Sequence, residues 1–394
     1  MSLRDRRRAF LAAFLGWMLD GYDFTILTLV LIDIQRDFNV AHAAIGALGT
    51  ATLLMRLVGG ALAGAAADRW GRKLPLMVSI LWFSAFAFLS GLSPGYQTLL
   101  LCRALFGLGM GGEWAAGMPL VLEHYPESRR GLVMGVLQGA FSWGFILAAG
   151  VFQLSYSALE GGAIAPWRLL MFSGLVPALL VIWIRRDVPE SPLWLAGRTA
   201  RAGPAMGSRS MLRLFLRPDV LAVAAILAAI MFAYQSMSFW YASLLRERAL
   251  APLQYLVALN VGGIAGAAIW GWAGDTRLGH RRALMLGAAL SLASLPAFLF
   301  ATSPSTLFAG ALAIGLTGAG MLGIAPSFVG RRFQTSERAL GWGVVYHIAV
   351  SAGALAPLAI GRLQDLGWTL PSAMAAAIGT ASVVAVALLA MTRD

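Results

Sequence analysis

Twelve apolar runs of about 20 residues, separated mostly by short turns, constrain this sequence more than any other feature. A helix of that length matches the thickness of the hydrocarbon core of a bilayer. The composition agrees, because only 12% of the 394 residues are charged, whereas soluble domains carry about 25%. We therefore predict an all-α membrane protein with transmembrane helices at residues 9–31, 43–67, 74–93, 97–122, 131–154, 167–184, 219–245, 252–273, 283–301, 305–330, 339–361 and 369–391.

The positive charge is concentrated in alternate turns between these runs. A net charge of +12 would suggest a nucleic-acid partner in a soluble chain, but here the cations flank membrane spans. By the positive-inside rule both termini are cytoplasmic, and we expect a multi-pass protein of the inner (plasma) membrane that contacts lipid and no nucleic acid. The clusters on the cytoplasmic side are Arg4–Arg8, Arg69–Lys73, Arg129–Arg130, Arg277–Arg282 and Arg331–Arg332.

The chain also repeats itself, since landmarks of its first half recur 207 or 208 residues later. The turn Gly64–Lys73 returns as Gly271–Arg282, and Ser128–Leu132 returns as Ser336–Leu340. The one long polar connection, residues 185–218, is then a cytoplasmic linker between two pseudo-symmetric six-helix bundles, residues 1–184 and 219–394. In carriers built from parallel repeats the substrate site lies near the midplane, between the halves.

The repeated turn itself predicts a moving part. Gly64 and Gly71 permit close helix approach and a tight turn, Asp68 can accept from a helix start or from a cation, and three cations face phosphate headgroups: Arg69, Arg72 and Lys73. A basic cytoplasmic turn would explain one copy, but two matching copies favour a conformational gate. Its predicted members are Gly64, Asp68, Arg69, Gly71, Arg72, Gly271, Asp275 and Arg281.

Five charged residues fall inside spans of the first half, namely Asp20, Asp23, Arg56, Arg103 and Glu113. Each costs roughly 2.5–3.5 kcal/mol on insertion scales, so each calls for a partner or a function. Asp20 and Asp23 share one helix face because they are three residues apart. Three acids against two arginines leave one carboxylate to exchange a proton, so we assign Asp20, Asp23, Glu113 and Arg103 to proton coupling. The alternative is a set of static ion pairs between helices.

Arg56 is the strongest candidate for substrate binding. A guanidinium stays charged, and its fork of paired N–H donors matches the two oxygens of a carboxylate. Its rival role is that of a permanent partner of Asp20 or Asp23.

Polar and aromatic residues at membrane depth supply further candidates for substrate contact. Aromatic belts at the membrane surface are the alternative for Tyr241, and interhelical hydrogen bonds are the alternative for Gln138 and Asn260. His347 either binds a carboxylate as imidazolium, relays protons, or is a neutral histidine held between helices. The full set is Tyr22, Gln138, Tyr234, Gln235, Ser238, Tyr241, Asn260 and His347.

The repeated turn resembles the loop signature of the major facilitator superfamily. More specific motifs are similar to its organic-acid:proton symporters, the branch that includes sialate, lactate, pyruvate and aromatic-acid symporters. These motifs are Trp17-x-x-Asp20-x-x-Asp23-Phe24, Arg56 ahead of Gly59-Gly60, Gly111-Gly112-Glu113-Trp114 and Pro189-Glu190-Ser191-Pro192-x-Trp194-Leu195. The resemblance implies that Asp20, Asp23 and Glu113 take part in proton coupling and substrate handling.

The second half departs from that pattern. Relatives often carry Tyr-Asn-x-Gly-Arg in span 11, whereas this sequence reads Tyr346-His347-Ile348-Ala349-Val350 and has no arginine there. One binding arginine fits a monocarboxylate better than a dianion.

Several classes are excluded by missing motifs. A Walker-type phosphate loop is absent, so ATP does not drive the protein. Cys and His are too sparse for a metal site, the single Cys102 excludes an internal disulfide, and no nucleophile–base set is visible. We therefore expect neither an enzyme nor a cofactor. Span 5 also lacks the Gly-Pro motif of drug exporters.

We predict a monomeric secondary transporter that takes up a small organic acid anion together with H+ by alternating access, most simply a monocarboxylate such as lactate or pyruvate. A sugar or drug carrier of the same fold is an alternative, because the Pro189–Leu195 run also occurs in sugar porters. Neutral sugars, however, do not need Arg56. A transporter-like substrate sensor is a further alternative, although sensors usually carry long tails and only a few residues follow the last span.

Overall fold

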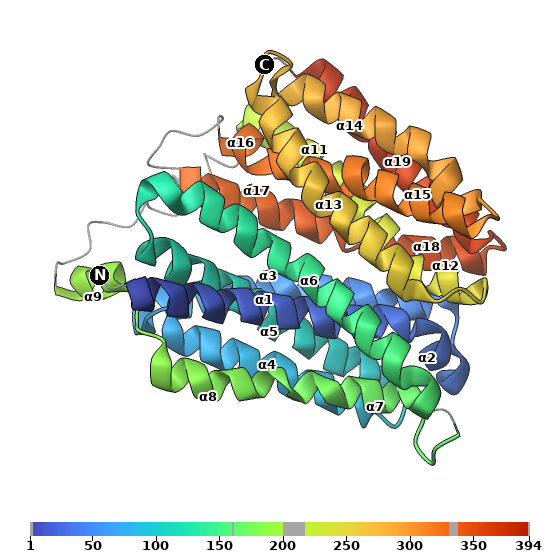
Figure 1. Ribbon diagram of the computed structural model, residues 1–394, viewed down its shortest axis with the longest axis horizontal. Coiled ribbons are helices and arrows are strands. Elements are labelled where there is room, and N and C mark those ends of the chain that lie inside the picture. Colours follow the sequence, from blue (N-terminus) through green and yellow to red (C-terminus); the bar gives the residue numbers. More distant parts are fainter. Residues whose placement is uncertain (1–2, 160, 200–216, 331–337, 393–394) are drawn as a thin grey trace. The chain divides into compact units, whose positions relative to one another are not determined.

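The computed structural model describes residues 3–159, 161–199, 217–330 and 338–392, and it confirms the all-helical membrane fold (Figure 1). Eleven helices of the described residues are long and apolar enough to cross a membrane. The predicted span 339–361 corresponds to two shorter helices, α17 (Arg338–Gly353) and α18 (Ala356–Asp365). By their contacts the residues form two compact units, Met1–Val40 with Ala47–Gly203 and Ala41–Gly46 with Pro204–Asp394.

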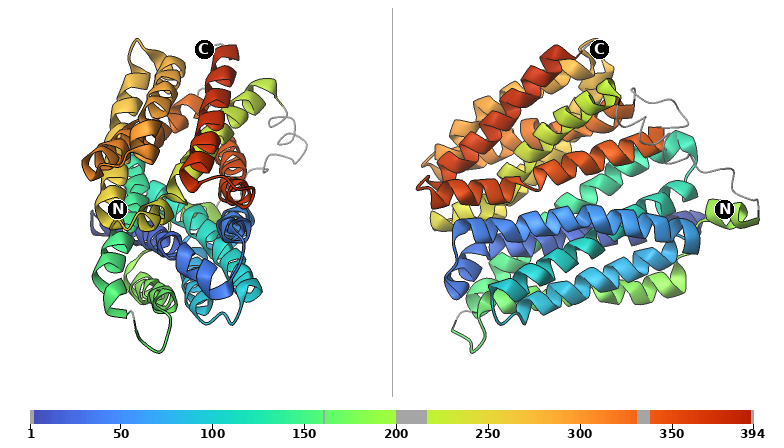
Figure 2. Two further views of the ribbon diagram at one scale, coloured as in Figure 1. Left: turned by 90° about the vertical axis from the view of Figure 1, so that its right-hand side faces the viewer. Right: turned by 180° about the vertical axis from the view of Figure 1, so that it is seen from behind.

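The first of these, unit 1, is a bundle in which α1 packs on α6 and α5, and α4 packs on α5 and α8. Figure 2 shows these helices running alongside one another. Its elements are α1 (Leu3–Leu29), α2 (Leu31–Phe38), α3 (His42–Trp70), α4 (Lys73–Gly91), α5 (Tyr96–His124), α6 (Glu127–Leu159), α7 (Pro166–Phe172), η1 (Ser173–Leu175), α8 (Pro177–Asp187) and α9 (Pro192–Thr199).

The second, unit 2, packs α11 on α17 and α19, and packs α13 on the broken tenth span. Its remaining elements, besides α17 and α18, are α11 (Pro218–Ser238), α12 (Tyr241–Glu247), α13 (Pro252–Asp275), α14 (Gly279–Leu295), η2 (Pro296–Phe300), α15 (Pro304–Ile314), η3 (Gly315–Ala319), η4 (Gly320–Ile324), α16 (Ala325–Gly330) and α19 (Leu370–Met391). Of the predicted linker 185–218, residues 200–216 lie outside the described part of the chain.

Proline and glycine set the helix boundaries. Proline stands in the first turn of α7, α8, α11, α13, α15, α18 and α19. A backbone N–H at this position has no partner within the helix, so proline, which lacks that N–H, costs no hydrogen bond there. The turn after α3 requires Gly71 at φ +95°, and the turn after α13 requires Gly279 at φ +76°. Both lie in the left-handed region that only glycine enters freely, so each copy of the repeated motif turns at a glycine with positive φ.

Glycines also bring helix backbones into contact at equivalent places in the two units. On α5, a Cβ at Gly107 would overlap the Thr52 carbonyl of α3, and a Cβ at Gly111 would overlap the Arg56 carbonyl of α3. In unit 2 a Cβ at Gly315 would overlap the carbonyl of Leu259 on α13. Small residues at such crossings allow helices in lipid to gain close packing, and here they fix the position of the α3 segment that carries Arg56.

The units differ in the regularity of their helices. In unit 1 the fourth span is one continuous helix, α5, although it contains Pro119. In unit 2 the tenth span passes from α15 through a π-turn, η3, and a 3-10 turn, η4, before α16. The ninth span likewise ends in a π-turn, η2, which begins at Pro296.

Candidate functional site

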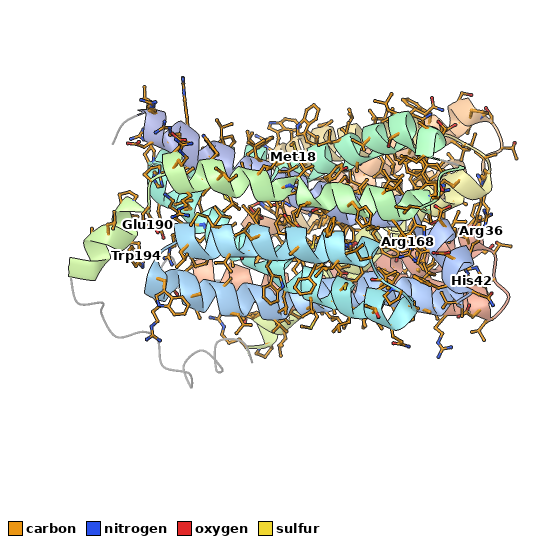
Figure 3. All side chains as sticks on the ribbon, turned by 90° about the horizontal axis from the view of Figure 1, so that it is seen from below. Met18, Arg36, His42, Arg168, Glu190 and Trp194 are labelled. Atoms are coloured by element: carbon orange, nitrogen blue, oxygen red, sulfur yellow. The ribbon has the colours of Figure 1, made fainter. Side chains whose placement is uncertain are left out.

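Every Asp, Glu and Arg side chain that is buried among the described residues belongs to unit 1. Asp20 and Asp23 of α1, Arg56 of α3, and Arg103 and Glu113 of α5 are between 0% and 7% exposed. Met18, two residues before Asp20, lies well inside the length of the bundle in Figure 3. Since a charge inside the bilayer is costly, this concentration makes the α1–α3–α5 region the candidate site of the unit.

One group within this region consists of Asp20, Arg56 and Glu113. Arg56 interacts electrostatically with both acids, and its guanidinium carbon lies 4.6 Å from the centre of the Trp17 ring. Trp17 in turn packs on Trp114, with ring centroids 4.3 Å apart. The aromatic pair therefore supports the guanidinium from α1 and α5 while both carboxylates lie within its field.

A second group consists of Asp23 and Arg103, which also interact electrostatically. Arg103 is fully buried. Its Nε donates to Ser90 Oγ at 3.0 Å, and its guanidinium carbon lies 4.4 Å from the centre of the Phe106 ring. Three helices, α1, α4 and α5, thus meet at this arginine.

Both groups contain buried polar atoms without hydrogen-bond partners among the described residues, and in the second group these are Asp23 Oδ2 and the two terminal nitrogens of Arg103. Among the described residues, neither carboxylate oxygen of Asp20 has a hydrogen-bond partner, and the same is true of Glu113 Oε2 and Arg56 Nη2. A buried charge without partners is strongly destabilising. A proton on a carboxylate, or an anion at the guanidinium, would remove that cost.

Two predicted substrate contacts of unit 1 have other surroundings. The Tyr22 hydroxyl forms a hydrogen bond with Ser173 Oγ at 2.7 Å, so it joins α1 to η1. Gln138 is exposed on α6.

The candidates of unit 2 are neutral polar groups. Gln235 and Ser238 of α11 are buried, and neither Gln235 Oε1 nor Ser238 Oγ has a hydrogen-bond partner among the described residues. Tyr234 lies one residue before Gln235 and is partly buried. Asn260 of α13 donates from Nδ2 to the Leu256 carbonyl at 2.8 Å, within its own helix.

Tyr241 is fully buried at the start of α12. Its ring lies 4.3 Å from that of Phe298, and its hydroxyl has no partner among the described residues. His347 belongs to α17, but its side chain lies outside the described residues.

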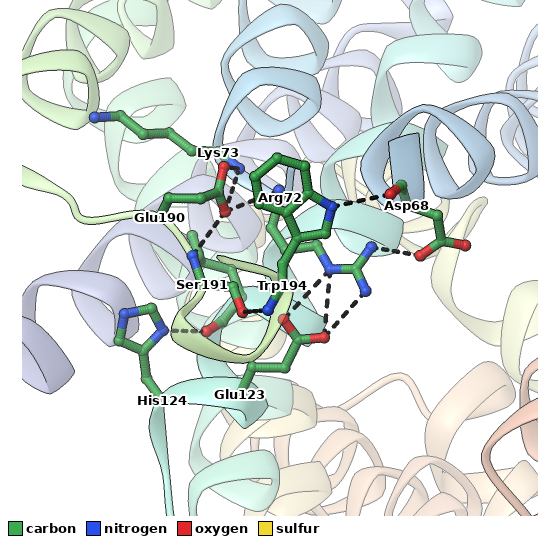
Figure 4. Close-up of polar contacts among 9 residues, drawn as sticks. Asp68, Arg72, Lys73, Glu123, His124, Glu190, Ser191 and Trp194 are labelled. Carbon is green, nitrogen blue, oxygen red and sulfur yellow. Dashed lines mark hydrogen bonds and ion pairs between the residues drawn. The ribbon is translucent and has the colours of Figure 1, made fainter. Parts of the chain in front are cut away.

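The predicted gate of unit 1 is a charge network at the end of the bundle where Glu190 and Trp194 lie (Figures 3 and 4). Arg72 forms ion pairs with Asp68 and Glu123. We expected Arg72 at the lipid headgroups, but its side chain is 15% exposed and points to these acids, because two carboxylates outcompete water and phosphate for it. Burial lowers the pKa of the Arg72 guanidinium, yet its bonds to Glu123 and Asp68 prevail and raise that pKa.

A clasp formed by residues 189–194 holds this turn in place. Glu190 accepts hydrogen bonds from the backbone N–H groups of Arg72 at 2.9 Å and Lys73 at 3.1 Å, so a carboxylate sits at the N-terminus of α4, where the helix dipole favours it. Trp194 Nε1 donates to the Asp68 carbonyl at 2.9 Å. Among the other predicted gate residues, Gly64 has no heavy atom within 4 Å of an added Cβ, and Arg69 lies against Trp70.

The second copy of the turn uses different bonds. Asp275 lies 3.4 Å from His280 Nε2. Arg281 donates from Nε to the Leu389 carbonyl at 2.7 Å, and it also bonds the Ala390 carbonyl, so it caps the end of α19. A Cβ at Gly271 would lie 3.8 Å from the Gly323 carbonyl, an ordinary contact.

Several residues of this arrangement were not singled out from the sequence. Trp17 and Trp114 appeared only as parts of motifs, and nothing in their spacing indicated that Trp17 would support Arg56. Ser90, Ser173 and Glu123 carried no local signal, since each meets its partner at a distance of at least 13 residues along the chain.

Comparison with known proteins places the chain in a family. The chain is 31% identical to a probable 4-methylmuconolactone transporter of Cupriavidus pinatubonensis, over 91% of this chain and 84% of the relative. It is 29% identical to the sialic acid transporter NanX of Escherichia coli, over 90% and 86%, and 28% identical to a cis,cis-muconate transport protein of Acinetobacter baylyi, over 91% and 88%.

The fold has a solved counterpart as well. A bacterial homologue of the human lysosomal transporter Spinster, in an inward-facing and unoccupied conformation, matches with a TM-score of 0.74 over 99% of this chain and 96% of that one, at 18% identity. The family model of the Major Facilitator Superfamily matches residues 13–269, which is more than half of the chain. The protein is therefore a multi-pass membrane transporter, not an enzyme, and belongs to the Major Facilitator Superfamily.

Proposed function

We propose that this protein takes up a small organic acid anion together with a proton across the inner membrane. The observation that carries the proposal is the group of Asp20, Arg56 and Glu113, buried together with unsatisfied carboxylate oxygens. The names of the relatives support the substrate class, because muconate and sialic acid are organic acids and methylmuconolactone is the lactone of one.

Each member of this group has a distinct role in the proposal. Arg56 binds the substrate carboxylate with its guanidinium fork, and Trp17 holds that fork in place. Asp20 and Glu113 lie in the same field and exchange the proton. A protonated carboxyl is neutral and does not compete with the substrate anion for the guanidinium. Proton binding and substrate binding therefore favour each other.

Asp23 and Arg103 have a supporting role. Their interaction and the bond from Arg103 to Ser90 join α1, α4 and α5. We assign Asp23 to coupling through its neighbour Asp20, with which it interacts, and we assign Arg103 to positioning Asp23 through their electrostatic interaction.

The substrate is best described as a monocarboxylate such as lactate or pyruvate. Arg56 is the arginine that interacts with Asp20 and Glu113, and its Nη2 has no hydrogen-bond partner among the described residues. A monoanion needs one such fork. Within unit 2, Gln235 and Ser238 are buried polar side chains whose chemistry suits hydroxyl or keto oxygens.

The test is uptake into proteoliposomes that contain the purified protein. An inward proton gradient should drive accumulation of radiolabelled lactate or pyruvate, and Glu113→Gln should abolish accumulation while exchange of internal for external substrate continues. Accumulation that ignores the proton gradient would refute coupling.

The substrate role of Arg56 needs a separate measurement. Arg56→Gln should remove carboxylate-induced thermal stabilisation of the detergent-purified protein, whereas Arg36→Gln, at an exposed position, should leave it intact. Stabilisation by a neutral sugar in the Arg56→Gln variant would favour a sugar carrier instead.

A further inference from the structure

An apolar groove on unit 1 has no part in the proposed transport. It has a volume of about 630 Å³ and is formed by α3, α4 and α5, within the range of about 300–1,000 Å³ that is typical of ligand sites. Its walls are Leu62, Ala66 and Trp70 of α3 and Leu74, Val78 and Trp82 of α4. Gly59 of α3 and Gly109 of α5 also line it, and the lack of side chains there makes room for the hollow.

The apolar wall of the groove lies on another face of α3 than Gly64 and Asp68 of the predicted gate, whereas Arg69 belongs to both the gate and the groove. Leu62, Ala66 and Trp70 are four residues apart and so share one face of α3. Gly64 and Asp68 are two residues from these positions, about 200° around the helix. The groove-lining side chains are also open to the surroundings, since Leu62 is 64% exposed and Val78 is 52% exposed. In a membrane-spanning helix such apolar side chains face acyl chains.

One end of the groove is positively charged. Arg69 lines it, and the Arg69 guanidinium carbon lies 5.6 Å from the centre of the Trp70 ring. No carboxylate among the described residues pairs with Arg69, whereas the neighbouring Arg72 is held by two acids and Lys73 Nζ donates to the Arg185 carbonyl. Arg69 is therefore the cation of this turn that remains available to a ligand.

We propose that the groove binds an anionic phospholipid, with one acyl chain between α3 and α4 and its phosphate on Arg69. The apolar walls suit a hydrocarbon chain, and Trp70 at the charged end suits the headgroup level, where tryptophan is enriched. An uncompensated arginine at that level favours a lipid with net negative charge. A water-soluble phosphate would match Arg69 but would leave the apolar walls unused.

The test is native mass spectrometry of the delipidated protein with phosphatidylglycerol, phosphatidylcholine or glycerol 3-phosphate. The wild type should retain phosphatidylglycerol about fivefold better than phosphatidylcholine, and it should not retain glycerol 3-phosphate. Arg69→Gln should abolish the preference for phosphatidylglycerol, and Ala66→Leu, which fills the groove, should weaken binding of both lipids. Equal retention of phosphatidylglycerol by Arg69→Gln and wild type would overturn the proposal.

Two controls and a label on the wild type make the result independent of folding defects. Arg186→Gln removes another exposed arginine at the end of a span, and Ala61→Leu enlarges an exposed alanine elsewhere on α3; both should bind like the wild type. Phosphatidylglycerol with a photoreactive acyl chain should label peptides of α3 and α4 in the unmodified protein. Labels spread over both units without enrichment there would contradict the assignment.

Discussion

Two glycines make room for the carboxylate of Glu113. A Cβ at Gly16 would lie 2.7 Å from Glu113 Oε1, and a Cβ at Gly117 would lie 3.2 Å from the same atom. Gly16 faces the acid from α1, and Gly117 lies one helical turn beyond it on α5. The proposed proton-exchanging group therefore occupies a space that exists because two neighbours have no side chain.

Gly16→Ala should impair coupling without unfolding the protein. The atom that must move is the end of a flexible side chain, and alanine favours a helix by about 1 kcal/mol over glycine. We expect proton-driven uptake to fall several-fold while the melting temperature stays constant or rises. Gly139→Ala on α6 is the matched control, because an added Cβ there meets no heavy atom within 4 Å. Equal uptake by the two variants would show that the position of Glu113 is unimportant.

At the scale of the element, the clasp formed by residues 189–194 determines how the turn between α3 and α4 is held. Glu190 accepts three backbone N–H groups, those of Arg72, Lys73 and Ser191. By contrast, the Asp187 carboxylate bonds a partly exposed arginine, Arg8, at 2.8 Å. The first arrangement is charge-assisted and fixed by backbone geometry, whereas the second is a surface ion pair.

Glu190→Gln should therefore destabilise the protein more than Asp187→Asn. Hydrogen bonds to a charged group contribute about 1.5–3 kcal/mol, whereas an exposed ion pair contributes about 0–1 kcal/mol. Thermal unfolding in detergent measures the difference, and limited proteolysis should cut residues 189–194 faster in Glu190→Gln. If Asp187→Asn proves as damaging, the clasp does not hold the turn.

The sequence predicted the helices and turns well where the signal was local. Apolar length located the spans, and Gly71 was expected to permit the tight turn that it makes at φ +95°. It could not separate α5 from the tenth span, because both are rich in glycine, yet only the latter breaks into η3 and η4. The bond between Tyr22 and Ser173 was equally hidden, since 151 residues separate them and only the tertiary fold brings them together.

At the scale of the whole molecule, charge and neutrality are divided between the two units. The buried acids and arginines of the described residues belong to unit 1, and unit 2 contributes buried amides and hydroxyls such as Gln235 and Ser238. If one proton accompanies one monoanion, the complete cycle moves no net charge. The driving force is then the proton concentration gradient alone.

Uptake should accordingly be indifferent to membrane potential. A potential of 100 mV is worth about 2.3 kcal/mol per transferred charge, so an electrogenic cycle would respond strongly. Proteoliposomes with equal pH on both sides and a potassium diffusion potential set by valinomycin provide the measurement. Faster uptake with a negative interior would indicate that more than one proton moves with each monoanion.

The division between the units also bears on how such a carrier diversifies. Uncharged side chains of unit 2, such as Gln235 and Ser238, can be exchanged for other uncharged ones without adding a charge to the membrane interior. Such replacements change the free energy of membrane insertion little, and they leave the acids of unit 1 unchanged. A lineage of these carriers can thus vary the polar side chains of unit 2 while it inherits the proposed proton-exchanging acids of unit 1 unchanged.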